Sequence, residues 1–294
     1  MQAIDNVVVY GLGNMGYLVA ERIAKQFPVT VFDIDAEKMK KAEASFGAKA
    51  FDSQKTLPGK SIIVLSLPRP DISQAVLETL TGSLEHGSVV VETSTVNPEH
   101  VKKSQEILEP HGISIVDASV LAGVSQMEAG SATLLLGGER KAIDDSQTVL
   151  DAIAERQIYF GDAGAGAAAK VINNAVAHAV MVVVAEAGSM AKAAGVDRDK
   201  LVGLLSDAQM GLHRPLTHRY VDRIAHDHYE GGMPLGAARK DSTLALEMAQ
   251  TLGVPLFAIQ GSHSVYEMAN SAGYGREDYA AIARLWADWG CPAA

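Results

Sequence analysis

The chain of 294 residues has almost no cysteine and no excess of positive charge. Cys291 is its only cysteine, which excludes a disulfide framework and a thiolate metal site within one chain. Acidic residues outnumber basic ones by 35 to 25, giving a net charge of −10, and no long basic run occurs. Nucleic acid and anionic membrane surfaces are therefore poor partners for this protein.

Internal repeats and low-complexity segments are missing as well. The first residues, M-Q-A-I-D-N, do not have the pattern of a signal or transit peptide, so we expect a cytoplasmic protein. Hydrophobic residues make up 48% of the chain and charged residues 20%, which is typical of a globular protein with one large domain or two.

The first motif is a glycine loop. The apolar run Val7–Val9 leads into G-x-G-x-x-G at Gly11, Gly13 and Gly16, and a helical pattern follows. In this context the pattern predicts a dinucleotide site: Gly11 permits a tight turn, Gly13 lets the backbone approach a pyrophosphate, and Gly16 lets the helix close on the strand. The same loop adds three predicted cofactor contacts, Leu12, Asn14 and Met15. A glycine-rich turn without a ligand is the alternative.

An acidic residue follows at the expected distance. The segment V-T-V-F-D ends at Asp33, about 20 residues after the first glycine, where an acid binds the adenosine ribose in dinucleotide folds. Its carboxylate would repel a 2′-phosphate. Asp35 follows, and no arginine does, so the sequence predicts NAD rather than NADP. The alternative role for Asp33 is a helix N-cap.

Val- and Ile-rich segments alternate with helical patterns through the first half of the chain. This alternation indicates a mostly parallel sheet covered by helices on both faces. Further strands are predicted at residues 61–67, 88–94, 113–118, 133–136 and 158–161. Leu67 and Pro68, where the first of these ends, are predicted to contact the cofactor.

An alanine-rich stretch after Gly164 predicts one helix from about Ala167 to Ala194. Apolar residues occur on nearly all of its faces, so we expect the helix to be buried all round and to require a homodimer or larger assembly. The helix is long enough to be mistaken for a membrane span, but Lys170, Asn174 and Glu186 favour the central helix of a soluble protein.

Lys170 and Asn174 lie one turn apart on the same face of this helix, and His178 extends the row. The lysine either reaches water along an apolar surface or lies half-desolvated in a cleft, where a lowered pKa would suit it to proton transfer. Four later histidines lack the spacing of a zinc site, so we predict no metal: His213, His218, His226 and His228.

Beyond the long helix only helical patterns occur, at residues 197–207, 215–225, 235–252, 255–272 and 278–289. The predicted fold is α/β followed by all-α. It combines a Rossmann-like doubly wound sheet in residues 1–163 with a helical domain in residues 164–294, which starts with the long interdomain helix.

Four segments of the chain form a distinctive set: G-L-G-N-M-G at 11–16, E-T-S-T-V-N-P at 92–98, G-A-G-A-A-A-K-V-I-N-N at 164–174 and K-D-S-T-L-A-L-E-M-A at 240–249. Together they resemble the β-hydroxyacid dehydrogenase family, which includes 3-hydroxyisobutyrate dehydrogenases and tartronate semialdehyde reductases. The resemblance covers nearly the whole chain. It implies a Rossmann domain, a long interdomain helix and a helical domain, assembled as a homodimer or homotetramer.

The resemblance also implies roles for single residues. Lys170 would be the catalytic lysine and Asn174 a substrate-binding residue, while Thr95 would lie on the nicotinamide side of the cofactor. Lys240 would lie by the cofactor and Asp241 near the active site. The implied reaction is hydride transfer between NAD and the carbinol carbon of a small hydroxyacid, with Lys170 as general acid and base.

One segment departs from the family pattern. Residues 117–123 read D-A-S-V-L-A-G where the family usually has D-A-P-V-S-G-G. Leu121 and Ala122 replace the serine and glycine of the substrate loop, which ends at Gly123. We therefore expect short hydroxyacids to bind poorly. Arg214, in the helical domain, is a candidate partner for a substrate carboxylate, with a surface ion pair as the alternative.

Two other functions stay open at this point. Imine reductases that use NADPH share the implied fold but usually lack the lysine. Some relatives keep the dinucleotide fold as non-catalytic binding modules. Lys170 beside Asn174 favours an oxidoreductase that acts on a CH–OH group.

Overall fold

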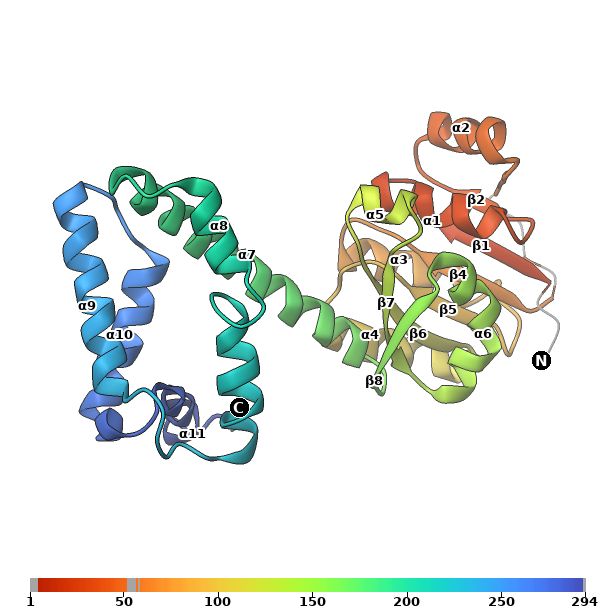
Figure 1. Cartoon of the computed structure of the whole chain (residues 1–294). Coiled ribbons are helices and arrows are strands. Elements are labelled where there is room, and N and C mark those ends of the chain that lie inside the picture. Colours follow the sequence, from red (N-terminus) through yellow and green to blue (C-terminus); the bar gives the residue numbers. More distant parts are fainter. Residues whose placement is uncertain (1–4, 52–56, 58, 293–294) are drawn as a thin grey trace. The chain divides into compact units, whose positions relative to one another are not determined.

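The computed structural model describes residues 5–51, 57 and 59–292, and the chain divides into two compact units. The first unit ends at Ala175 and the second begins at Val176. This division falls inside one continuous helix, α7 (Ala165–Ala193), which therefore belongs to both units (Figure 1). The domain boundary that the sequence predicts at Gly164 stays a prediction.

The first unit is built on an eight-stranded sheet with the order β3-β2-β1-β4-β5-β6-β7-β8. Its strands are β1 (Asn6–Tyr10), β2 (Thr30–Phe32), β3 (Lys49–Ala50), β4 (Ser61–Leu65), β5 (Val89–Glu92), β6 (Ser114–Leu121), β7 (Thr133–Gly138) and β8 (Arg156–Gly161). Neighbouring strands are parallel except for the antiparallel pair β6 and β7. The predicted α/β sheet is thereby confirmed.

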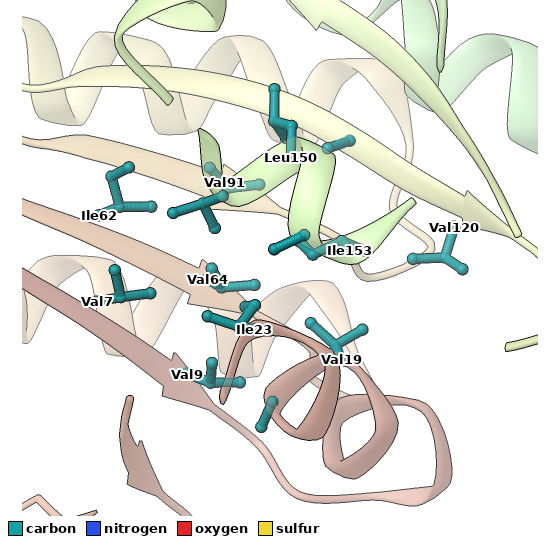
Figure 2. Close-up of a cluster of buried hydrophobic side chains, with 14 of the residues drawn as sticks. Val7, Val9, Val19, Ile23, Ile62, Val64, Val91, Val120, Leu150 and Ile153 are labelled. Atoms are coloured by element: carbon teal, nitrogen blue, oxygen red, sulfur yellow. The ribbon is translucent and has the colours of Figure 1, made fainter. Parts of the chain in front are cut away.

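Helices cover both faces of this sheet because its strands are apolar at consecutive positions. Along β1, Val9 belongs to the buried cluster on one face, together with Ile23 and Ile153 (Figure 2). Val8 belongs to the cluster on the other face, with Leu77. The helices of this unit are α1 (Asn14–Ala24), α2 (Ala36–Phe46), α3 (Pro70–Leu80), α4 (Pro98–Leu108), α5 (Val124–Glu128) and α6 (Arg140–Ile153).

Some strand limits differ from the sequence prediction. β6 continues to Leu121 instead of ending at Ala118, because its antiparallel partner β7 pairs Thr133 with Leu121. β4 ends at Leu65, so Leu67 and Pro68 lie in the loop after the strand. β3 and α5 were not predicted, since elements of two and five residues are too short to show a period.

Helix α7 forms as predicted, but the expectation that it is buried all round is wrong for the single chain. Only 6% of its most apolar 18-residue window is buried, and Ile172, Val176 and Met181 are each about 60% exposed. The rest of the chain does not cover all of the apolar surface of this 29-residue helix. Among the described residues, α7 is the one helix long and apolar enough to cross a membrane, judged by length and composition alone.

The second unit is helical, with α8 (Arg198–Ser206), α9 (Leu235–Leu252), α10 (Ala258–Ser271) and α11 (Arg284–Asp288). Two predicted α-helices take other forms. Residues 215–221 form a π-helix followed by a short 3₁₀ turn, and residues 279–283 form a 3₁₀ helix before α11. The buried carboxylate of Asp278 lies 3.0 Å from Arg219 Nε in the π-helix and accepts a hydrogen bond from Ala280 N. This tertiary anchor overrides local propensity in both segments.

The acidic residue in the apolar half of α7 has a structural role. Glu186 is buried, and its carboxylate accepts hydrogen bonds from Ala258 N at 2.8 Å, from Ile259 N at 3.1 Å and from Phe257 N. Burial raises the pKa of Glu186, but these three hydrogen bonds outweigh it and hold the pKa below its usual range. Glu186 therefore caps the start of α10 from the helix beside it.

Candidate cofactor and active site

The glycine loop after β1 requires glycine at two positions for steric reasons. Gly11 has φ of 93°, and a Cβ there would lie 2.2 Å from the carbonyl oxygen of Ser66. A Cβ on Gly16 would lie 2.0 Å from the carbonyl oxygen of Gly11, so α1 closes directly on the loop. A Cβ on Gly13 would have no atom within 4 Å, which leaves that side of the loop open.

This open side coincides with the start of a helix. Gly13 is the N-cap of α1, and no side chain caps the helix. The first N–H groups of a helix lack partners within it, and together with the helix dipole they bind phosphate groups. The open Gly13 and the uncapped α1 therefore fit the pyrophosphate of a dinucleotide.

A cleft of about 480 Å³ lies at this point, at the carboxyl ends of β1, β2 and β4. Eight of the predicted cofactor residues line it: Gly11, Gly13, Asn14, Met15, Gly16, Asp33, Leu67 and Pro68. Ile34, Ile72 and Val76 add apolar surface suited to an adenine ring. Leu12 is buried and does not line the cleft.

Asp33 is held in the cleft by two backbone N–H groups. Its carboxylate accepts hydrogen bonds from Leu12 N at 2.7 Å and Asp35 N at 2.9 Å. The N-cap of α2 is Asp35, which accepts from Glu37 N, so Asp33 is free of that role. Lys38 Nζ lies 3.5 Å from the Asp33 carboxylate and also lines the cleft. Sequence reasoning missed Lys38, although it lies only five positions after Asp33.

Hydrogen bonds join the loops that follow β4 and β5. Leu67 N donates to Ser94 Oγ at 2.8 Å, and Ser94 N donates to Glu92 Oε1 at 2.9 Å. Thr93 Oγ1 donates to the carbonyl oxygen of Leu65 at 2.6 Å. The exposed Thr95 follows directly, so its position is fixed relative to the cleft wall at Leu67.

Glu92 is a buried acid that the sequence reading did not single out. Burial raises its pKa, and the hydrogen bonds from Ser94 offset part of that effect. His100 Nε2 lies 4.0 Å from Glu92 Oε2, and burial lowers the pKa of His100. Neither of these two atoms has a hydrogen-bond partner among the described residues. Burial thus favours the uncharged form of both side chains.

Lys170 lies near the start of α7 and is only 9% exposed. Within the described part of the chain, its amine has no hydrogen bond or ion pair. Burial lowers the pKa of Lys170, which increases the neutral fraction of its amine at a given pH. Asn174, one turn further on, is partly exposed, and His178 is exposed.

The predicted substrate loop begins at the end of β6. Leu121, the last residue of the strand, is half-buried, and Ala122 packs against the core. Gly123 N donates to Gln126 Oε1 at 2.8 Å just before α5. Side chains alternate along a strand, so Leu121 is on the same face of β6 as Asp117. Asp117 contacts the start of α7, which places Leu121 on the side of the sheet where Lys170 lies.

Three predicted site residues belong to the second unit. Arg214 is exposed, and Lys240 and Asp241 form an exposed ion pair with 3.0 Å between Nζ and Oδ1 on α9. Their roles at the cofactor and the substrate stay predictions. No group of three or more His, Cys, Asp or Glu side chains suited to a metal ion occurs within the described ranges, the late histidines included.

Family models cover almost the whole chain. A model of the NAD binding domain of 6-phosphogluconate dehydrogenase matches residues 6–161. A second, described as the NAD-binding part of NADP-dependent 3-hydroxyisobutyrate dehydrogenase, matches residues 164–286.

Comparison with individual proteins agrees with the family models. The chain is 30% identical to the 2-(hydroxymethyl)glutarate dehydrogenase of Eubacterium barkeri, over 94% of this chain and 93% of that protein. It is 27% identical to the 3-sulfolactaldehyde reductase of Escherichia coli (strain K12), over 94% of each chain. A solved imine reductase from Bacillus cereus BAG3X2 has the same fold, with a TM-score of 0.84 and 19% identity over 96% of this chain and 99% of that one.

The surroundings of Asp33 lead to a prediction on cofactor choice. In the unmodified protein the Asp33 carboxylate repels a 2′-phosphate, so kcat/KM should be higher with NAD than with NADP. Replacing Asp33 by Ser together with Ile34→Arg should raise the ratio of kcat/KM for NADP to that for NAD, because Lys38 is then no longer paired with an acid. Steady-state kinetics with both cofactors measure this ratio. An unmodified protein that already prefers NADP would contradict the role of Asp33.

Proposed function

Because the chain belongs to the β-hydroxyacid dehydrogenase family of NAD(P)-dependent oxidoreductases acting on CH–OH groups, we propose that it interconverts a hydroxyacid and the matching carbonyl compound with Lys170 as general acid and base. The observation that carries this proposal is the burial of Lys170 without a charged partner among the described residues.

The residues of the first unit have separate tasks in this proposal. The glycine loop and the start of α1 hold the pyrophosphate, and Asp33 accepts hydrogen bonds from the adenosine ribose. The linked loops at Leu67 and Thr95 hold the nicotinamide end. When bound, the nicotinamide accepts or supplies the hydride.

Proton transfer falls to Lys170. During oxidation the neutral amine takes the proton of the substrate hydroxyl group. During reduction the ammonium group donates that proton and stabilises negative charge on the substrate oxygen. Asn174, one turn along α7, orients the same oxygen. The lowered pKa of Lys170 makes both protonation states accessible closer to neutral pH.

Replacing Lys170 by Ala should lower kcat by roughly 10²–10⁴-fold, the usual range for a positioned proton donor or acceptor. Affinity for NAD should not change, because the glycine loop is untouched. In the unmodified enzyme, oxidation should speed up as pH rises through the pKa of Lys170, and reduction should slow over the same range. Stopped-flow and steady-state kinetics measure these effects. The matched control is Lys192→Ala, an exposed lysine in the last turn of the same helix. If Lys170→Ala keeps nearly full turnover, Lys170 does not take part in proton transfer and its amine is only solvated.

We propose that a second copy of the chain, rather than a lipid bilayer, covers the exposed apolar faces of α7. Two features support this: Glu186 is committed to capping α10, and apolar residues remain exposed on the same helix. Burying them in a homodimer removes apolar surface from water, worth about 25 cal/mol per Å².

Light scattering at micromolar concentration, without detergent, should therefore give the mass of a dimer or larger assembly. Replacing Met181 by Glu should shift the protein toward monomer, because it places a charge on an exposed apolar position of α7. Lys102→Glu on α4 is the control. A soluble unmodified monomer, or a protein that dissolves only in detergent, would refute the proposed dimer.

We further propose that the substrate is larger or less polar at one end than 3-hydroxyisobutyrate. Leu121 offers no hydrogen-bond donor, and a polar group buried against it loses about 1–3 kcal/mol. Ala122 adds a methyl group where a glycine would let the substrate approach the backbone. The relatives named above act on 2-(hydroxymethyl)glutarate and 3-sulfolactaldehyde, which both carry an anionic group. Arg214 is the proposed partner for such a group.

The double variant Leu121→Ser with Ala122→Gly should raise kcat/KM for 3-hydroxyisobutyrate relative to the best substrate, because it restores a donor and removes a methyl group. A panel of hydroxyacids identifies that best substrate; a cyclic imine offered with NADPH tests for imine reduction. Val124→Ala, at an exposed position two residues beyond Ala122, is the control. An unchanged ratio of kcat/KM values would show that Leu121 does not line the substrate pocket.

A further inference from the structure

The start of α7 has no capping group of its own. Residues 163–169 read A-G-A-G-A-A-A and offer no side-chain acceptor. A helix start without acceptors leaves backbone N–H groups unsatisfied, which is costly where the helix is buried. Asp117, 47 residues earlier in the chain, supplies the acceptors: Gly164 N donates to its Oδ1 at 2.9 Å and Ala167 N to its Oδ2 at 2.7 Å.

The carboxylate lies between two glycines, Gly137 and Gly166. Asp117 is completely buried. A Cβ on Gly137 of β7 would lie 2.6 Å from Asp117 Oδ1. A Cβ on Gly166 of α7 would lie 2.4 Å from the carbonyl oxygen of Leu135 and 2.9 Å from Asp117 Oδ2. The first turn of α7 thus contacts the backbone of the sheet, with the Asp117 carboxylate between them.

Lys170 is one helical turn beyond Gly166 and on the same face of α7. Between Gly166 and Lys170 the helix is continuous, so a shift or rotation of its first turn moves the lysine by a similar amount. A displacement of about 1 Å at a reacting group is enough to lower a rate by two orders of magnitude.

We propose that Asp117 is a positioning residue, which holds the first turn of α7 on the sheet and thereby places the Lys170 amine for proton transfer. This inference rests on the proposed role of Lys170 as general acid and base. Asp117 acts through the helix and makes no contact with the reacting atoms.

A carboxylate suits this task better than an amide. Both of its oxygens accept hydrogen bonds, and its negative charge is favoured at the positive end of the helix dipole. An asparagine at the same position would turn an NH₂ group toward one of the two N–H donors. Burial raises the pKa of Asp117 and the bonds from α7 offset part of that effect. Glu92, its register neighbour on β5, has its own pKa raised by burial, which limits charge repulsion between the two acids.

Two variants disturb this contact from opposite sides. Asp117→Asn removes one acceptor and keeps the size of the side chain. Gly166→Ala keeps the carboxylate but forces the helix away from Leu135 and Asp117, while alanine favours the helix itself. If Asp117→Asn fails to fold, Gly166→Ala carries the test alone. Ile153→Val, which removes one buried methylene from α6 remote from this contact, is the control for a general loss of stability.

We expect both variants to bind NAD like the unmodified protein, measured by fluorescence titration, and to lose about 10- to 100-fold in kcat. The rise of the oxidation rate with pH, which follows deprotonation of Lys170, should move to higher pH. A displaced amine is better hydrated, and hydration raises its pKa. Ile153→Val should lower only Tm. If the variants that fold have the same kcat and the same pH dependence of oxidation as the unmodified protein, Asp117 only caps the helix and does not position Lys170.

A double-mutant cycle separates this inference from the proposed function. If Asp117 acts through Lys170, adding Asp117→Asn to Lys170→Ala should not lower the residual kcat further. Independent, multiplying effects would overturn the positioning role. Near-full activity of Lys170→Ala alone would instead overturn the role of the lysine, and with it the reason for placing that amine.

Discussion

Distant carboxylates accept hydrogen bonds from backbone N–H groups that have no acceptor of their own in three places of this protein. Asp117 on β6 accepts from the start of α7, and Glu186 within α7 accepts from the start of α10. Asp33 accepts from Leu12 in the glycine loop. Each acid joins two segments that are far apart in the sequence. The carboxylates that accept hydrogen bonds from the backbone N–H groups therefore also hold the fold together around the site.

Local patterns predicted the parts of the fold that local sequence encodes. Consecutive valines in β1 indicated a sheet covered on both faces, and the G-x-G-x-x-G spacing with Asp33 located the residues that line the cleft. The family resemblance, carried by four segments, agrees with the comparisons. The sheet pattern and the glycine loop with Asp33 depend on neighbours within about 30 residues, the span of one strand–helix–strand unit.

Other features depend on contacts that no local pattern contains. The capping role of Asp117 involves partners 47 and 50 residues away, and the π-helix at Pro215–Val221 is anchored by Asp278. Lys38 was visible in the sequence, but only the structure shows its amine beside Asp33. The single chain leaves α7 exposed, because the apolar pattern of a helix indicates burial but not whether the same chain or a second copy covers it.

All residues that line the dinucleotide cleft come from positions 10–76, while the predicted substrate residues begin at Leu121. Asp33, the predicted determinant of NAD or NADP preference, and the predicted substrate loop at Leu121 therefore lie on separate stretches of the chain. Substitutions at Leu121 would then leave the residues that line the dinucleotide cleft unchanged, and substitutions at Asp33 would leave the predicted substrate loop unchanged.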